Sequence, residues 1–171
     1  MENERDGRVG RVIQAGRQML TAARTAPKGR GVDIIECALL DKDDIARVSE
    51  TMKVLYAETG REVYNRDSDN IMKADAMFVV ATRDMPLGLN CRHCGFATCE
   101  EKPVGVPCAI NSVDVGIAIG SAVSVAADCR IDCRVMFSAG MAAERMNLFD
   151  GCRQYFCMPL SCSSKNPFFD R

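Results

Sequence analysis

Four cysteines near the middle of the chain have types and spacing suited to binding one metal centre. Cys91, Cys94 and Cys99 fall within nine residues and Cys108 follows, which gives the spacing C-x2-C-x4-C-x8-C. A 4Fe-4S cluster needs four thiolates that converge on one site, and closely spaced cysteines on a loop can supply them. The glycines and prolines between these cysteines favour a loop over a helix. The spacing therefore indicates an iron-sulfur site on these four residues.

Three other interpretations of the same cysteines stay open from the residues alone. Zinc also accepts four cysteines, but structural zinc sites usually use two C-x2-C pairs, and this segment has one. A redox-active C-x-x-C pair normally begins a helix after a strand, and it would leave Cys99 and Cys108 unexplained. The last alternative is a chance grouping in a chain with 10 cysteines.

Basic residues in two segments are candidates for binding the phosphate of a cofactor. Lys28 and Arg30 lie in the glycine-rich segment "PKGRG", whose side chains and backbone N–H groups could hold a phosphate. Arg171, at the end of the chain with Lys165 and Asn166 before it, could reach the same kind of group. A solvated turn and an ordinary polar terminus are the alternatives for these two segments.

The remaining cysteines and the single histidine are weaker candidates. A second metal site would need several of the later cysteines to converge, whereas cysteine also serves as a small buried apolar residue. Cys37, within an apolar segment, is expected in the core. His93 stands between two expected ligands, and we expect it to be an exposed loop residue. The later cysteines are Cys129, Cys133, Cys152, Cys157 and Cys162.

Composition excludes several classes of function. The 171 residues carry a net charge of -1 and no Trp, so neither a broadly basic nucleic-acid surface nor a stacking platform is expected. The charged segment "MENERDGR" precedes no hydrophobic signal, and the apolar run 113–127 is expected to be too short to span a bilayer. We therefore expect a cytoplasmic protein, in a compartment where thiols stay reduced and free for metals.

The elements that must position these residues follow from the hydrophobic pattern. Strands and helices alternate without a linker, so we expect one domain over 1–171, an α/β fold in which helices flank a sheet, with a cysteine-rich insertion at 84–110. The strand at 32–40 is expected to be buried on both faces, and the helix at 112–128 to be central because it is apolar nearly all round. The other expected elements are helices at 8–23, 41–59 and up to about 73, strands at 76–82 and 133–141, a short helix at 142–146 and an extended arm at 154–171.

The chain as a whole resembles a known family. The segments "CRHCGFATCEE", "AARTAPKGRGVD", "DVGIAIGSAVSVAAD", "MFSAGMAAERM" and "PLSCSSKNPFFDR" are similar to those of an uncharacterised bacterial and archaeal family that contains a ferredoxin domain. This resemblance covers most of the chain, and it carries no agreed activity.

A weaker resemblance is to flavin-dependent nitroreductases. Their first long helix ends in a turn like "AARTAPKGRGVD", and they have a strand like "AMFVVAT" and an apolar central helix. The resemblance implies a nitroreductase-like domain with the iron-sulfur loop inserted before the central helix. It also implies FMN and a homodimer, since those folds build their flavin sites across a subunit interface. The Arg-x-Ser-x-Arg start of those enzymes is missing, and Arg30, Gly31 and Val32 replace the residues that commonly follow their turn.

The leading hypothesis is a redox protein with one 4Fe-4S cluster that exchanges electrons with a flavin or a partner protein. It would be an oxidoreductase if a substrate is reduced or oxidised at the flavin. A non-enzymatic electron carrier or redox sensor, and a protein whose metal is only structural, are the alternatives. The sequence shows no constellation of acid, base and nucleophile, so it does not name a substrate.

Overall fold

The chain folds around one four-stranded antiparallel sheet. The structure is a computed structural model and describes residues 1 and 3–168. The strand order is β1-β2-β4-β3, and every neighbouring pair is antiparallel. The strands are β1 (Ile35–Leu40), β2 (Ala76–Arg83), β3 (Asp132–Cys133) and β4 (Cys152–Ser161).

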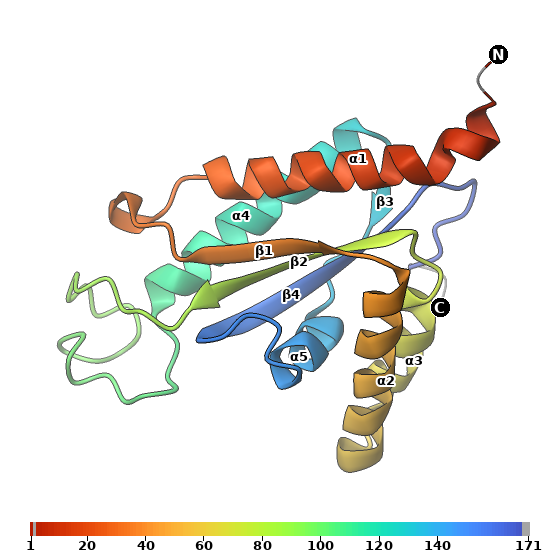
Figure 1. The fold of residues 1–171 in the computed structure, drawn as a ribbon. Helices are drawn as coiled ribbons and strands as arrows, with labels where there is room; N and C mark the ends of the chain where they lie inside the picture. Colours follow the sequence, from red (N-terminus) through yellow and green to blue (C-terminus); the bar gives the residue numbers. More distant parts are fainter. Residues whose placement is uncertain (2, 169–171) are drawn as a thin grey trace.

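Helices cover both faces of this sheet. As Figure 1 shows, α1 (Glu4–Thr25) and α4 (Ala109–Asp128) lie on one face. The opposite face carries α2 (Lys42–Thr59), α3 (Glu62–Ile71) and α5 (Phe137–Arg145). The expected fold class, a sheet with flanking helices, is confirmed.

Helix ends follow from local chemistry. The Asn3 side chain accepts a hydrogen bond from the Arg5 N–H at 3.0 Å and begins α1. Asp41 begins α2 in the same way by accepting from two backbone N–H groups, and Gly60 ends it with φ 66°. The buried stripe of α2 consists of four apolar residues of the core: Ile45, Val48, Met52 and Leu55.

The position of β2 between two layers of helices explains why its sequence is apolar without alternation. Phe78 and Val80 point into the core beneath α1 and α4, whereas Met77 and Val79 point into the core beneath α2, α3 and α5. Because helices cover both faces, both sets of side chains are buried.

Two burial predictions are wrong. The strand at 32–40 was expected to be buried on both faces, but β1 is an edge strand, and residues 36–39 are only partly buried. The helix at 112–128 was expected to be surrounded, but α4 presents one apolar face to solvent, with Val113 54% and Ile117 40% exposed. A Cβ built at Gly116 or Gly120 on this face meets nothing within 4 Å.

The structure also corrects the C-terminal elements. The strand predicted at 133–141 ends at Cys133, and α5 begins at Phe137 because its small residues let it lie directly on β4. A Cβ at Gly140 would lie 2.0 Å from the carbonyl oxygen of Tyr155. The segment predicted as an extended arm supplies β4, an interior strand. Pro159 argues against a strand in the sequence, since proline is rarely found inside a sheet.

The apolar run 113–127 was expected to be too short for a bilayer, and it forms part of a longer helix, α4. Within the described residues, α4 is the one helix long and apolar enough to cross a membrane by length and composition. In the fold its alanines at 118, 122 and 126 are fully buried in the core that α1 and the sheet share. The inner side of α4 thus packs in the core of the fold.

Candidate metal and cofactor sites

The four candidate metal ligands lie on one irregular loop between β2 and α4 (Figure 1). Cys91, Cys94 and Cys99 are half-buried within this loop, while Cys108 is buried at its end as the N-cap residue of α4. All four are free thiols. The loop contains no helix or strand, so its cysteines can move without unfolding any element.

Asn90 closes the first part of the loop. Its side-chain oxygen accepts a hydrogen bond from the backbone N–H of Cys99 at 2.8 Å, and its own N–H donates to the Cys99 sulfur at 3.3 Å. Asn90 directly precedes Cys91, so these bonds bring the first and third cysteines of the segment toward each other. Positive φ angles at Asn90, Arg92 and Gly95 produce the tight turns between them.

The donor set suits an iron-sulfur cluster. Cys108 makes no side-chain hydrogen bond to the first turn of α4, so the N–H groups there remain available to an anionic group. In the structure the thiols are still separate: among the described residues, no three cysteine, histidine, aspartate or glutamate side chains form a metal-binding group. Four free thiols on one loop that ends at a helix N-terminus fit the group in number and chemistry, and only the irregular loop has to close around it.

The start of the loop is fastened to the first turn of α4. Asn111 is 1% exposed, and its amide nitrogen donates to the carbonyls of Arg83 at 3.2 Å and Met85 at 3.1 Å. The Asn111 side-chain oxygen is buried without a hydrogen-bond partner in the described part of the chain. The backbone N–H of Asp84 donates to the carbonyl of Gly151 at 3.2 Å. The loop is therefore held where it leaves β2.

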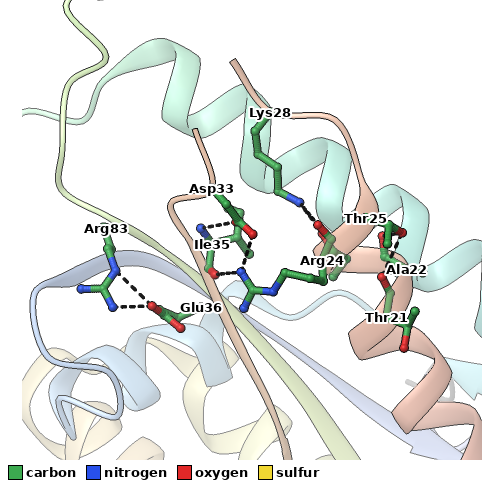
Figure 2. A network of polar contacts seen from close by, with 10 residues as sticks. Thr21, Ala22, Arg24, Thr25, Lys28, Asp33, Ile35, Glu36 and Arg83 are labelled. Atoms are coloured by element: carbon green, nitrogen blue, oxygen red, sulfur yellow. Dashed lines mark hydrogen bonds and ion pairs between the residues drawn. The ribbon is translucent and has the colours of Figure 1, made fainter. Parts of the chain in front are cut away.

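Both cations of the "PKGRG" turn donate hydrogen bonds within the fold. Lys28 Nζ donates to the carbonyls of Ala23 at 2.7 Å and Arg24 at 2.6 Å, and Figure 2 shows it reaching back to the last turn of α1. Arg30 donates to the carbonyl of Leu87 at 2.7 Å, which ties the turn to the cysteine loop. Lys28 thus caps a helix C-terminus, where the dipole favours a cation.

A buried carboxylate holds the same turn against α4. Both oxygens of Asp114 accept from the Gly29 N–H at 3.0 Å, and Asp114 is buried. A Cβ at Gly29 would lie 2.7 Å from the side chains of Ile110 and Leu87. This role was missed from the sequence, although a lone carboxylate in an otherwise apolar helix is a usable signal for it.

The later cysteines are dispersed through the fold. Cys152 and Cys157 are buried in β4, Cys133 and Cys162 are half-buried, and Cys129 is exposed. Burial raises the pKa of the Cys133 and Cys157 thiols, as it does for Cys37. These three thiols stay protonated near neutral pH and pack as small apolar groups. His93 is exposed on the loop, as expected.

A cationic cavity of about 830 Å³ lies between the first turns of α1 and the segment that follows β4. Four cations line it against the carboxylates of Glu4 and Asp75: Arg5, Arg8, Lys73 and Lys165. Arg8 pairs with Asp75, and this hydrogen bond raises the pKa of Arg8. Arg5 and Lys165 form no ion pair with any other described residue.

The start of α1 and the segment after β4, which line the cavity, lie at one end of the sheet, and the loop between β2 and α4 lies at the other (Figure 1). Of the basic residues considered for a phosphate, Lys165 lines the cavity, while Lys28 and Arg30 lie at the end that carries the loop. Arg171 falls outside the described residues.

Residues 104–171 match the model of a protein family described as "Uncharacterized protein containing a ferredoxin domain" (DUF2148). The matched part includes Cys108 and α4 and begins after the first three loop cysteines. The chain is also 36% identical over 179 residues to an uncharacterized protein of Archaeoglobus fulgidus. That alignment covers 99% of this chain and 96% of the relative.

Several solved flavoprotein structures share the fold. A nitroreductase with bound FMN from Desulfitobacterium hafniense DCB-2 superposes with a TM-score of 0.61 at 16% identity, covering 96% of this chain and 92% of that chain. A nitroreductase with bound FMN from Bacteroides fragilis NCTC 9343 gives 0.61 at 12% identity, with 88% and 77% covered. A BluB-like flavoprotein from Clostridium difficile 630 gives 0.54 at 18%, with 89% and 84% covered. The expected nitroreductase-like fold is confirmed.

Proposed function

The chain belongs to the family of uncharacterised proteins that contain a ferredoxin domain, and from this premise we propose that it is a cytoplasmic redox protein with one 4Fe-4S cluster. The ligands in this proposal are Cys91, Cys94, Cys99 and Cys108. When bound, such a cluster supplies one-electron transfer. The observation that carries the proposal is the arrangement of four free thiols on one irregular loop that ends at the N-terminus of α4.

The protein's own residues prepare the loop for this role. Asn90 orients Cys99, and Asn111 anchors the first residues of the loop. Arg30 ties Leu87, also near the start of the loop, to the neighbouring turn. These contacts limit the conformations from which the four thiols must converge. They support a site that closes without a rearrangement of the sheet or of α4.

FMN is the second cofactor in the proposal, and the cationic cavity supports a place for its phosphate. Arg5 and Lys165 supply positive charge that no described carboxylate neutralises, and serine hydroxyls beside Lys165 supply further donors. Lys28 and Arg30 are less suited, because their side chains already bond to backbone carbonyls. The phosphate therefore belongs at the end of the sheet that carries the start of α1.

A homodimer connects the two proposed sites. Within one protomer the segments that line the cavity and the cysteine loop lie at opposite ends of the sheet (Figure 1). The exposed face of α4 runs between these ends and carries Val113, Gly116, Ile117 and Gly120. An antiparallel pairing of two α4 helices directs the loop of one protomer toward the cavity of its partner. Electrons then pass between a flavin and a cluster held by different subunits.

Anaerobic purification followed by absorption spectroscopy and iron and sulfide analysis tests this function. We expect iron and sulfide in equal amounts and a broad visible band that bleaches with dithionite. Zinc without sulfide would contradict the cluster. A yellow flavin released on denaturation supports an oxidoreductase, whereas a cluster-loaded protein that cannot be reconstituted with FMN is an electron carrier or redox sensor.

A further inference from the structure

A lysine is buried in the cysteine loop between the third and fourth cysteines. The side chain of Lys102 is 4% exposed, although lysine is almost never fully buried unless it is paired. Its ammonium group donates hydrogen bonds to the backbone carbonyls of Val106 and, at 3.4 Å, Pro103. The loop therefore folds around this cation in the stretch that leads to Cys108.

The carboxylate that faces Lys102 compensates its charge only in part. Asp84 Oδ1 lies 3.9 Å from the ammonium nitrogen, which is longer than a hydrogen bond. The other oxygen of Asp84 lies 3.8 Å from Nε of Arg153, so one carboxylate faces two cations. The Lys102 ammonium is thus bonded to two neutral carbonyl oxygens, and its one carboxylate partner in the described chain is distant and shared with Arg153.

We propose that Lys102 is the counter-charge of the iron-sulfur centre and sets its reduction potential, an inference that rests on the proposed function. Four thiolates give the centre a negative charge, which increases by one when it accepts an electron from a flavin or a partner protein. Lys102 lies three residues after Cys99, and its hydrogen bond to Val106 holds the backbone that leads to Cys108. Because water screens a buried charge poorly, the ammonium stabilises the reduced state and raises the potential. Asp84 opposes this effect.

The chain offers a matched control on the same loop. Arg92 directly follows Cys91 and carries the same charge, but it is exposed. Solvent and salt screen an exposed charge, so removing it should change the potential less. Comparing Lys102→Gln with Arg92→Gln therefore separates the effect of a buried counter-charge from the general charge of the loop.

The test is a redox titration of the anaerobically purified full chain, with iron and sulfide measured in each variant. Lys102→Gln should shift the potential to a more negative value, Asp84→Asn to a more positive one, and Lys102→Arg should remain near the wild type. An unchanged potential in a cluster-loaded Lys102→Gln protein, or an equal shift in Arg92→Gln, overturns the inference. If Lys102→Gln loses its iron, the reduction potential of Asp84→Asn is the deciding measurement. An unchanged potential in Asp84→Asn then overturns the inference. A wild-type protein without iron and sulfide instead refutes the proposed function itself, before any potential is compared.

Discussion

At the scale of single residues, the ten cysteines separate into two groups by environment. The four proposed ligands lie on an irregular loop or at its end, whereas the other six lie on or beside regular elements. Cys37 is typical of the second group: it lies on β1, is half-buried, and burial raises the pKa of its thiol. A neutral thiol packed in this way contributes apolar contact to the core.

This separation predicts different outcomes for two cysteine variants. Cys94→Ala removes a proposed ligand and should lose or degrade the cluster, with iron per chain falling well below that of the wild type. Cys37→Ala removes one half-buried sulfur and should lower stability by about 1 kcal/mol without changing iron content. Iron and sulfide analysis with thermal unfolding measures both effects. Equal iron content in the two variants would remove the ligand assignment.

At the scale of elements, close backbone packing fixes the position of α5. The helix lies against β4 at Gly140, where even a methyl group would overlap the Tyr155 carbonyl. The Ser138 hydroxyl also donates a hydrogen bond to Asp67 on α3 at 2.5 Å. These contacts join α3 to α5 and fasten this helical layer to β4, on the face of the sheet opposite α1 and α4.

A pair of glycine variants tests this packing. Gly140→Ala should destabilise the protein by about 3 kcal/mol, because backbone rather than a flexible side chain obstructs the new methyl group. Gly10→Ala is the matched control: it lies within α1, a Cβ there meets nothing within 4 Å, and it should stabilise by about 0.5–1 kcal/mol. Chemical denaturation measures both changes. A Gly140→Ala protein as stable as the wild type would contradict the packing described.

At the scale of the whole molecule, α4 has one face in the core and one apolar face open to solvent. Its buried side holds alanines against α1 and the sheet, and its open side presents Val113 and Ile117 beside glycines. Contiguous exposed apolar surface of this kind is typical of an interface. The proposed dimer covers this face and brings the two cofactor sites of different subunits toward each other.

A charged substitution on the open face tests the dimer without disturbing the protomer. Gly120→Arg should convert a dimer into a monomer, since the position has free space in the protomer but none in an interface. Val54→Arg, on the exposed surface of α2 on the opposite face of the sheet, should leave the oligomeric state unchanged. Size-exclusion chromatography with light scattering measures the mass. A wild-type monomer, or a Gly120→Arg dimer, contradicts the proposed interface.

Local signals in the sequence determined much of this protein. Helical periodicity and capping residues define α1 and α2, and an unbroken apolar run defines β2. Cysteine spacing, which is a local pattern, indicated the loop and its candidate ligands. These features depend on residues close together in the chain, so they can be read without knowledge of the fold.

Tertiary structure alone decided the features that depend on distant partners. β4 is an interior strand because β2 and β3 pair with it on both sides, although Pro159 argues against a strand locally. Lys28 and Arg30 bond to carbonyls of α1 and the cysteine loop. Arg5 and Lys165, which form no ion pair with another described residue, line instead a cavity between two segments far apart in sequence. The burial of Lys102 likewise arises only when the loop folds back on itself. Pairing, burial and the neutralisation of charge are properties of groups that the fold brings together, and sequence spacing does not encode them.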